Sequence, residues 1–412
     1  MSINLYAAPF EMQVIEAPTF PANTFYVTAG NTIQEIINQC SAAGGGTVII
    51  PAGEWATGPL HLNNNVHLHF EDGATLLFSD NPDDYLPVVF TRWEGMECYN
   101  YSPLIYANGC HNLAITGRGK LLGNGANWWN WKKTQQKAAN ELCYAEFNNT
   151  PVEERIYGTK EAGLRPSFLQ FINCSNILID GITMIDGPQW TLHPVYCENI
   201  IIRNTTIHTV GHNTDGLNPD SCKNVLIENC NFFTGDDCIA INSGMNEDGW
   251  RVNRPCENII IRNCTMTGGH GAVVIGSAMS GGVRNIYAHD CKVNNTMQGI
   301  RLKSMRGRGG FVENVTFENF EINDVSNEAI QVNMYYEFST VVPKSDAPSL
   351  FKNITIKNVS GVGADTAIMI KGLPERKLEN ITLQDISLKA NKPFICTDID
   401  GLCLNNIVLT AI

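Results

Sequence analysis

Apolar and polar residues alternate in a short pattern that recurs along most of the chain, each time after an asparagine. The copies read SNILIDGITM, ENIIIRNTTI, KNVLIENCNF, ENIIIRNCTM, RNIYAHDCKV, ENVTFENFEI, KNITIKNVSG and ENITLQDISL. Their asparagines are Asn176, Asn199, Asn224, Asn258, Asn285, Asn314, Asn353 and Asn380, with weaker copies at Asn65 and Asn112 and a final one at Asn406. A period of two with many β-branched residues predicts strands that bury one face.

The spacing of the copies predicts how the strands are arranged. Successive asparagines lie 23, 25, 34, 27, 29, 39 and 27 residues apart, with turn-forming Gly, Asn, Asp and Thr between them. Repeats of this length that stack on their neighbours form a solenoid. We therefore expect an all-β chain with one right-handed parallel β-helix. The spacings of 34 and 39 indicate coils with surface insertions.

The domain boundaries follow from where this pattern starts and is interrupted. Residues 1–23 precede it as an N-terminal extension, and residues 24–412 form the β-helix domain. Within TIQEIINQCSAA, apolar residues at helical spacing predict an N-terminal capping helix, which Asn31 or Thr32 could cap. Residues 124–165, with NWWNWKK and a charged stretch, interrupt the repeat and predict a long surface insertion.

Cysteines occupy fixed places in the repeat. Cys174, Cys197, Cys222 and Cys256 each lie two residues before the asparagine. Another set, Cys230, Cys264 and Cys291, lies six residues after it. Because equivalent positions of successive coils stack, we expect buried ladders of free thiols and an inward-facing ladder of asparagine amides at a turn.

Composition excludes several classes of partner. A net charge of −13 argues against nucleic acid, which needs a broad basic surface. No apolar run reaches the roughly 18 residues of a membrane span.

The start, MSINLYAAPFEMQ, lacks the features of a signal peptide. We therefore expect a cytoplasmic protein or, as the alternative, a secreted or periplasmic one whose signal has been removed.

Four segments concentrate unusual polar residues: HNTDGLNPDSC, TGDDCIAINSG, GGHGAVVIGS and GIRLKSMRGRGG. Asp215 and Asp236 are 21 residues apart, close to one coil, and strands of adjacent coils lie about 4.8 Å apart. His270 follows one inserted coil later, and Arg301 one coil after that. All four segments are thus expected on one face.

Clustered carboxylates suit acid–base chemistry, because their repulsion raises at least one pKa. A protonated carboxyl beside ionised ones is what glycoside hydrolysis requires. Asp236 and Asp237 can share a groove only if the chain bends, which Gly235 would allow. Arg301 and Lys303 leave a strand on the same side and suit a substrate carboxylate. Arg306 and Arg308 extend this basic patch or form a solvated loop.

Calcium binding by the aspartates is the competing interpretation, which the nearby His, Arg and Lys disfavour. We expect no metal and no cofactor. A lone Asp-Asp pair or NTDG would by itself indicate only a turn. The coil spacing of all four segments is what favours a catalytic centre.

At these residues the chain resembles the polygalacturonases, family 28 of the glycoside hydrolases. Asn213-Thr214-Asp215, Gly235-Asp236-Asp237, Gly269-His270-Gly271 and Arg301-Leu302-Lys303 match its motifs. GRGKLLGNGANWW, GPQWTLHPVYCENI and GRGGFVENV look like its bacterial and plant branch, including exo-polygalacturonases. The resemblance implies hydrolysis of α-1,4-galacturonide bonds of pectin or oligogalacturonides with inversion.

The resemblance also implies roles for single residues. Asp236 would be the general acid, and Asp215 and Asp237 would hold and deprotonate water, supported by His270. Arg301, Lys303 and Tyr336 would bind the galacturonate carboxylate, and we add Asn213 and His193 to the substrate-binding residues. Many fungal members have a disulfide from the cysteine after the Asp pair. Here Cys238 is present, but its partner position is Met266, so we do not expect this bond.

Three alternatives stay open. One is hydrolysis of a decorated pectin such as rhamnogalacturonan, although the GHG histidine and the Arg-Lys pair favour a galacturonic acid polymer. Another is a non-catalytic carbohydrate-binding β-helix, such as an adhesin or tailspike. A third is a pectate lyase, which would need calcium and an arginine base. We expect exo action, because an insertion such as 124–165 could close one end of the groove.

Overall fold

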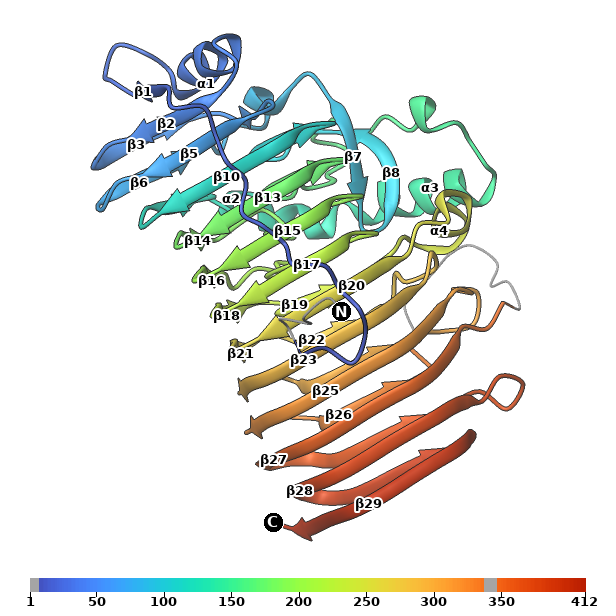
Figure 1. Cartoon of the computed structure of the whole chain (residues 1–412). Helices are drawn as coiled ribbons and strands as arrows, with labels where there is room; N and C mark the ends of the chain where they lie inside the picture. Colours follow the sequence, from blue (N-terminus) through green and yellow to red (C-terminus); the bar gives the residue numbers. More distant parts are fainter. Residues whose placement is uncertain (1–6, 337–346) are drawn as a thin grey trace.

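The computed structural model describes residues 7–336 and 347–412, which form a single long parallel β-helix. Figure 1 shows its coils stacked in sequence order from the N-terminal to the C-terminal end. Each coil contributes strands to columns in which a strand pairs in parallel with its equivalent one coil later. The predicted all-β solenoid is therefore confirmed.

Three columns make up the coils. The first contains β1 (Thr24–Tyr26), β2 (Gly46–Ile50), β5 (Val66–Phe70), β10 (His111–Gly117), β13 (Ser175–Asp180), β15 (Glu198–Arg203), β17 (Lys223–Glu228) and β20 (Cys256–Arg262). The second contains β3 (Gly53–Thr57), β6 (Ala74–Phe78), β11 (Lys120–Leu122), β14 (Thr183–Ile185), β16 (Thr206–His208), β18 (Asn231–Thr234) and β21 (Thr265–Gly268). Toward the C-terminus, single long strands span more than one column: β23 (Val283–Asn294), β25 (Phe311–Asn323), β27 (Leu350–Lys371), β28 (Leu378–Thr397) and β29 (Ile399–Ala411).

The third column carries the polar segments. It contains β4 (Leu60–His61), β9 (Ile105–Asn108), β12 (Leu169–Ile172), β19 (Ile239–Ile241), β22 (Gly271–Ile275), β24 (Gln298–Lys303) and β26 (Glu328–Asn333). Single bridges from Leu169 to Leu192, then to Leu217 and Ile239, continue it where no full strand forms. The residues that begin β19, β22 and β24 therefore lie side by side on successive coils.

The asparagine ladder fixes the register at the first turn. Each repeat asparagine has a left-handed backbone and donates its amide to the asparagine of the preceding coil, for example Asn199 to Asn176 at 3.3 Å and Asn258 to Asn224 at 3.0 Å. The ladder is half-buried to exposed rather than fully inward. Asn406 is not its last member: Asn406 bonds to Asp385 in a second ladder, and Gly401 lies beside Asn380 instead.

The cysteines stack inside the coils as free thiols. All fourteen cysteines are free, and the seven repeat cysteines are buried. The backbone N–H of Cys174 donates to the sulfur of Cys197 at 3.4 Å, and that of Cys222 to the sulfur of Cys256 at 3.4 Å. Cys238 is likewise free, in agreement with the absence of a disulfide partner at Met266.

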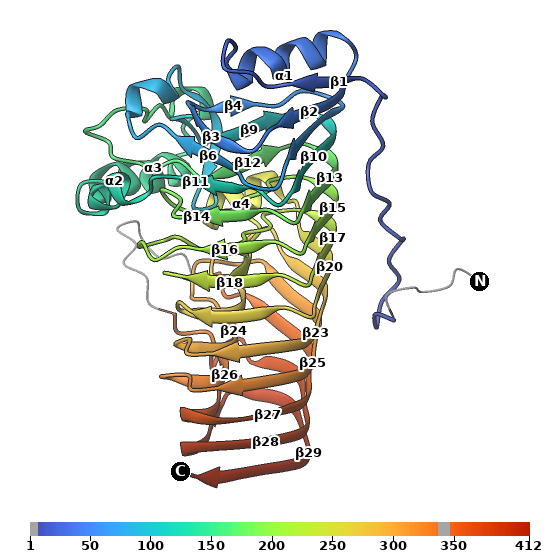
Figure 2. The same ribbon diagram turned by 90° about the vertical axis from the view of Figure 1, so that its left-hand side faces the viewer.

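Helix α1 (Ile33–Ala42) covers the N-terminal end of the solenoid (Figure 2). Thr32 accepts from the N–H of Glu35, and the Glu35 carboxylate accepts from the N–H of Thr32, so a capping box starts the helix. Ile33, Ile36, Ile37 and Cys40 face the core. The predicted cap is therefore confirmed, with Thr32 rather than Asn31 at its start.

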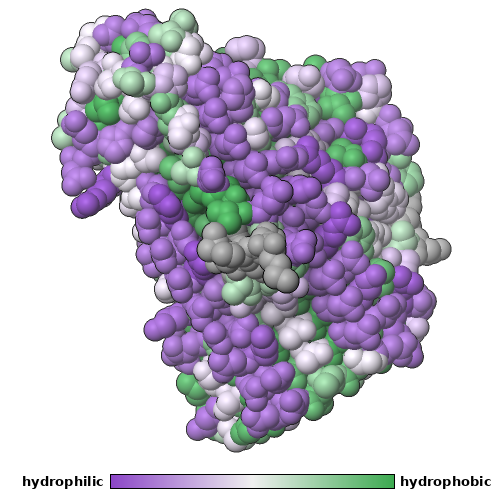
Figure 3. All heavy atoms as spheres, in the orientation of Figure 1, coloured by the Kyte–Doolittle hydropathy of each residue, from purple (hydrophilic) through white to green (hydrophobic). Residues whose placement is uncertain are grey.

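Residues 7–23 run in an extended path along the outer face of the first column (Figure 1). Ala8, Met12 and Ile15 pack there on outward-facing apolar residues of successive coils: Ala114, Leu178, Ile201, Leu226, Ile260 and Tyr287. Figure 3 shows this face as largely hydrophilic with hydrophobic patches. This cover explains why the strands carry three apolar residues in a row rather than strict alternation.

Further elements gather on one side of the coils, where β7, β8, α3 and α4 lie together (Figure 1). Strands β7 (Val89–Trp93) and β8 (Met96–Asn100) form an antiparallel hairpin that the sequence did not predict. The 124–165 segment contains α2 (Ala126–Trp129), α3 (Gln136–Phe147) and the short 3-10 turns Asn130–Lys133 and Val152–Glu154. A further 3-10 turn, Pro82–Tyr85, lies upstream of the hairpin. Helix α4 (Asn246–Val252) fills the 34-residue spacing.

The insertion in the 39-residue spacing lies partly outside the described residues. Among the described helices, none has the length and apolar character needed to cross a bilayer.

Candidate active site

A sharp bend after β18 brings two consecutive aspartates to the same cavity. Gly235 passes so close to the preceding coil that a Cβ atom would lie 2.2 Å from the Gly211 carbonyl oxygen. The hydroxyl of Thr234 donates to the Asp236 carbonyl at 2.6 Å, and the Asp237 N–H donates to the Asp236 carboxylate at 2.9 Å. Asp236 and Asp237 therefore both line the cavity, as the glycine led us to expect.

Asp215 comes from the preceding coil and is level with Asp237. The N–H of Gly216 donates to the Asp237 carbonyl at 3.0 Å. The Asp215 side chain is buried, and Asn218 donates to it at 2.9 Å. Burial, followed by the charges of Asp236 and Asp237, holds its pKa well above the ordinary value. The three carboxylates are thus neighbours, and Asp215 is the one on which a proton is favoured.

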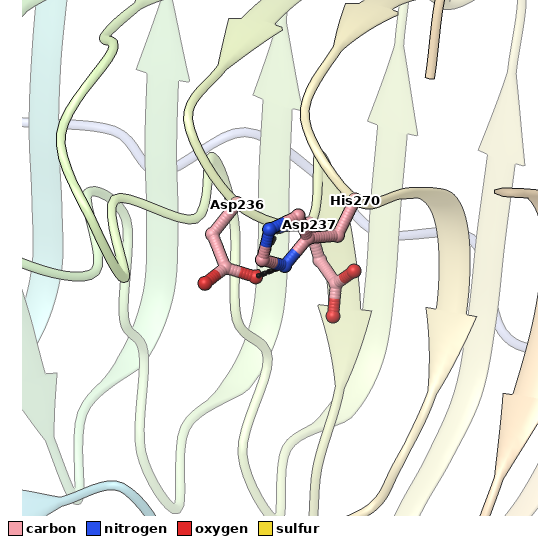
Figure 4. Close-up of side chains that lie close together, drawn as sticks. All are labelled: Asp236, Asp237 and His270. Carbon is pink, nitrogen blue, oxygen red and sulfur yellow. Dashed lines mark hydrogen bonds and ion pairs between the residues drawn. The ribbon is translucent and has the colours of Figure 1, made fainter. Parts of the chain in front are cut away.

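His270 pairs with Asp236. Its Nδ1 lies 2.9 Å from Asp236 Oδ1, as the dashed line in Figure 4 shows. The hydrogen bond to Asp236 raises the pKa of His270, although burial opposes this. Burial alone would raise the pKa of Asp236, but the bond from His270 and the charges of His270 and Lys303 outweigh burial and lower it.

The two shifts therefore favour a proton on His270, one hydrogen bond away from Asp236, where the sequence led us to expect it. A carboxylate that accepts a hydrogen bond from a cationic ring is stabilised in its charged form.

Arg301 and Lys303 on β24 reach the same carboxylate from the next coils. Lys303 Nζ lies 2.7 Å from Asp237 Oδ2, and Arg301 lies 3.6 Å from Asp237 Oδ1. The Tyr336 ring lies beside both cations, 5.1 Å from Lys303 Nζ and 5.6 Å from the Arg301 guanidinium carbon. Burial would lower the pKa of Lys303, but the Asp237 charge outweighs it and raises that pKa.

Asp236, Asp237 and His270 present donor atoms within 4.8 Å of one another, so the cation interpretation needs a test. Gly271 N–H donates to Asp237 Oδ1 at 2.8 Å, and Lys303 occupies Oδ2. Calcium prefers an all-oxygen shell. With an imidazole and an ammonium group already at these carboxylates, the donor set suits proton chemistry rather than a cation.

The cavity above these residues encloses about 590 Å³, open solvent included. Of the residues predicted from the sequence, its lining includes Asn213, Asp215, Asp236, Asp237, Lys303 and Tyr336. His270 and Arg301 reach the site through their ion pairs.

His193 does not reach the cavity lining. Its side chain is fully buried, and its ring bonds to Gln170 at 2.7 Å and to Asp220 at 3.4 Å. Its interior position does not support the predicted contact with substrate, because GPQWTLHPVY turns Trp190 rather than His193 toward the cavity.

Several lining residues were missed by the sequence reasoning. Glu94 and Met245 come from the hairpin β7–β8 and from the residues just before α4. Arg308 is buried at the cavity and donates to Asn246 at 2.6 Å, whereas Arg306 is paired with Glu375 at the surface. The basic patch therefore divides, with Arg308 in the site. The glycine in RWEGM, which is the second residue of the hairpin turn, was the available signal for the hairpin.

Comparison with known proteins agrees with this geometry. The family model described as "Glycosyl hydrolases family 28" matches residues 154–405, more than half of the chain. The structure resembles that of a hyperthermoactive exopolygalacturonase from Thermotoga maritima, with a TM-score of 0.91 and 37% identity over 96% of this chain and 94% of that chain.

Curated relatives point the same way. A probable polygalacturonase from Vitis vinifera is 28% identical, over 89% of this chain and 72% of the relative. An exo-poly-alpha-D-galacturonosidase from Dickeya chrysanthemi is 25% identical, over 92% of this chain and 68% of the relative. On the family match, the fold and the set of carboxylates, this chain belongs to family 28 of the glycosyl hydrolases.

Proposed function

We propose that this hydrolase cleaves α-1,4-linked galacturonic acid residues of homogalacturonan or oligogalacturonides, with inversion, from a chain end. The observation that carries the substrate class is the pair of Arg301 and Lys303 around Asp237, with the Tyr336 ring beside them. Paired cations next to catalytic carboxylates suit a sugar that carries its own carboxylate. The names of the Thermotoga and Dickeya relatives support the same class.

The residues divide the chemistry between them. The pair of His270 and Asp236 supplies the proton to the leaving oxygen, with Asp236 facing the cavity. Asp215 and Asp237, level with each other in adjacent coils, hold and activate the attacking water. An inverting mechanism requires such an acid and a base on opposite sides of the bond that breaks.

Exo action is supported by what lies at one end of the cavity. The hairpin β7–β8 packs on the 124–165 segment through a small separate core, in which Trp93 and Met96 contact Ala138 and Leu142. The hairpin turn reaches the cavity lining at Glu94. Helices and hairpin together therefore form a fixed wall beside the aspartates, of the kind that leaves room for a chain end.

Chromatography of the products from defined oligogalacturonides tests both parts of the proposal. Exo action predicts that one short product accumulates from the start and that the viscosity of polygalacturonate falls slowly. A rapid fall in viscosity with few new reducing ends would contradict it. The variant Asp236→Asn should lose hydrolysis but keep binding, and unchanged turnover would refute its role. Cleavage of rhamnogalacturonan oligomers in the same panel, with none of galacturonan, would overturn the substrate class.

A further inference from the structure

The turn of the hairpin β7–β8 has a backbone that its residue does not favour. Trp93 pairs with Met96, so Glu94 and Gly95 form a two-residue turn, with φ of 45° and 89°. Turns with positive φ at both central positions prefer Asn-Gly, Asp-Gly or Gly-Gly. A glutamate there is strained, and such strain persists only where the surroundings hold it and is concentrated at functional sites.

Buried contacts hold this turn in place. The Gly95 carbonyl accepts from the N–H of Met245 at 3.1 Å and from Arg92 Nε at 3.1 Å. Arg92 in turn forms a fully buried ion pair with Asp220 at 3.0 Å. A Cβ atom on Gly95 would lie 3.0 Å from the Met245 nitrogen, so the turn sits tightly on the neighbouring loop. The hairpin therefore presents Glu94 as a fixed group.

Glu94 lines the cavity, and one of its two carboxylate oxygens has a hydrogen-bond partner among the described residues. Gln189 donates to Oε1 at 2.8 Å, and no described residue donates to the other oxygen. Glu94 lines the cavity together with Asn213 and Asp236. Burial raises the pKa of Glu94 above its ordinary value, with a smaller contribution from the charge of Asp236, although the charges of Lys132 and Arg165 oppose this rise. The group is thus an acceptor aimed at whatever occupies this end of the cavity.

The coil order of the residues around Glu94 shows that Glu94 and the pair of Arg301 and Lys303 lie on opposite sides of the aspartates. Gln189, which bonds to Glu94, lies one coil before Asp215, whereas Arg301 and Lys303 lie on a coil after the aspartates. A sugar bound between Glu94 and the aspartates is therefore the last sugar at the walled end. In an α-1,4-linked chain, every interior residue uses its O4 in a bond, and only the non-reducing end has a free O4 hydroxyl.

We propose that Glu94 accepts a hydrogen bond from the O4 hydroxyl of the non-reducing terminal galacturonate and so selects chain ends. The inference rests on the proposed function and deepens it. The negative charge also repels the carboxylate of any residue that would extend the chain past this point, so one group both recognises an end and rejects an interior segment.

The test uses trigalacturonates that differ only at their ends. The saturated trimer has the O4 hydroxyl, the trimer with a 4,5-unsaturated non-reducing residue lacks it, and a trimer reduced to the alditol changes only the other end. The proteins are the wild type, Glu94→Asn and Glu94→Gln, with Glu141→Gln as a control in the exposed part of α3. Asparagine suits the turn but does not reach as far, whereas glutamine keeps the reach and removes the charge.

The wild type and Glu141→Gln should favour the saturated over the unsaturated trimer in kcat/KM, by on the order of 10- to 100-fold for a hydrogen bond to a charged group. In Glu94→Asn this ratio should collapse toward one through loss on the saturated trimer, and Glu94→Gln should be intermediate. The alditol should be cut like the saturated trimer. Glu94→Asn should also melt at a higher temperature than the wild type, because the turn strain is relieved.

Two results would overturn the inference: a ratio in Glu94→Asn within twofold of the wild-type ratio, or discrimination that follows the reducing end instead. A lower melting temperature in Glu94→Asn with the ratio unchanged would show that the residue is structural only. If the wild type cuts no galacturonate trimer at all, the proposed function fails, and this inference fails with it. That result is distinct from the two above, in which the wild type cuts the saturated trimer.

Discussion

Replacing Lys303 by methionine should destabilise the fold far more than the loss of a surface ion pair. The ammonium lies 2.7 Å from the Asp237 carboxylate, with side chains that are 9% and 3% exposed. At an effective dielectric constant of about 20, a separation of 2.7 Å corresponds to roughly 6 kcal/mol of gross attraction. Desolvation offsets much of this in the intact pair, but Lys303→Met removes the shorter of the two ion pairs of the buried Asp237 and leaves only Arg301, 3.6 Å away, to balance its charge. We expect a loss of about 3–5 kcal/mol in the free energy of unfolding.

Two variants make this reasoning testable by urea unfolding followed by circular dichroism. Lys303→Met with Asp237→Asn removes both charges and should recover most of the lost stability, while activity stays absent in both variants. Lys392→Met removes an exposed pair with Asp365 at 2.9 Å and should leave the free energy of unfolding almost unchanged. If the double variant were as unstable as Lys303→Met, or if Lys303→Met cost no more than Lys392→Met, the buried pair would not neutralise Asp237 as described.

Three further predictions concern the proton and the ladder. The pKa of His270 is raised above the ordinary histidine value of 6.5, so the proton of the His270–Asp236 pair is present below pH 6.5 and is lost as the pH rises through the raised pKa. His270→Gln should therefore move the alkaline limb of the kcat/KM profile to lower pH. An unmoved alkaline limb would contradict the role of this pair. The pKa of Asp215 is raised above 3.8, so ionisation of Asp215 destabilises the folded state as the pH rises. The free energy of unfolding of Asp215→Asn should therefore increase relative to that of the wild type between pH 4 and pH 7, by about 1.4 kcal/mol for each pH unit by which the pKa is raised. The same difference in free energy of unfolding between variant and wild type at both pH values would refute this. Asn224 has a φ of 54° and forms two hydrogen bonds of the ladder. Asn224→Ala should therefore lower the free energy of unfolding by about 2–4 kcal/mol, as measured by thermal unfolding. Asn224→Gly should lower it clearly less, because glycine adopts a positive φ without strain.

The coil period could be derived from the sequence because it is a local signal repeated many times. Each copy places an asparagine before an apolar run, and the structure bonds those asparagines in one ladder. The capping helix was also local, since Thr32 and Glu35 form its capping box. The last coil shows the limit of the signal: Asn406 resembles the repeat, yet the register assigns it to the second ladder.

The composition of the site followed from the same period, but its arrangement did not. Coil spacing brought Asp215, Asp236 and Asp237 to one face, as the structure shows. Contacts between coils place Asp215 beside Asp237 and bring His270 within hydrogen-bonding distance of Asp236. The sequence around His193 suggested a residue of the site, and only the packing of the coils shows that its side chain is fully buried.

The sequence by itself determined the solenoid and the set of catalytic side chains, because stacked repeats convert spacing along the chain directly into proximity. Only the tertiary structure decided what closes the cavity. Glu94 and Met245 reach it from a hairpin and from a loop outside the repeat, where spacing carries no information about position. Their placement depends on buried pairs such as Arg92 with Asp220, which join segments far apart in the chain.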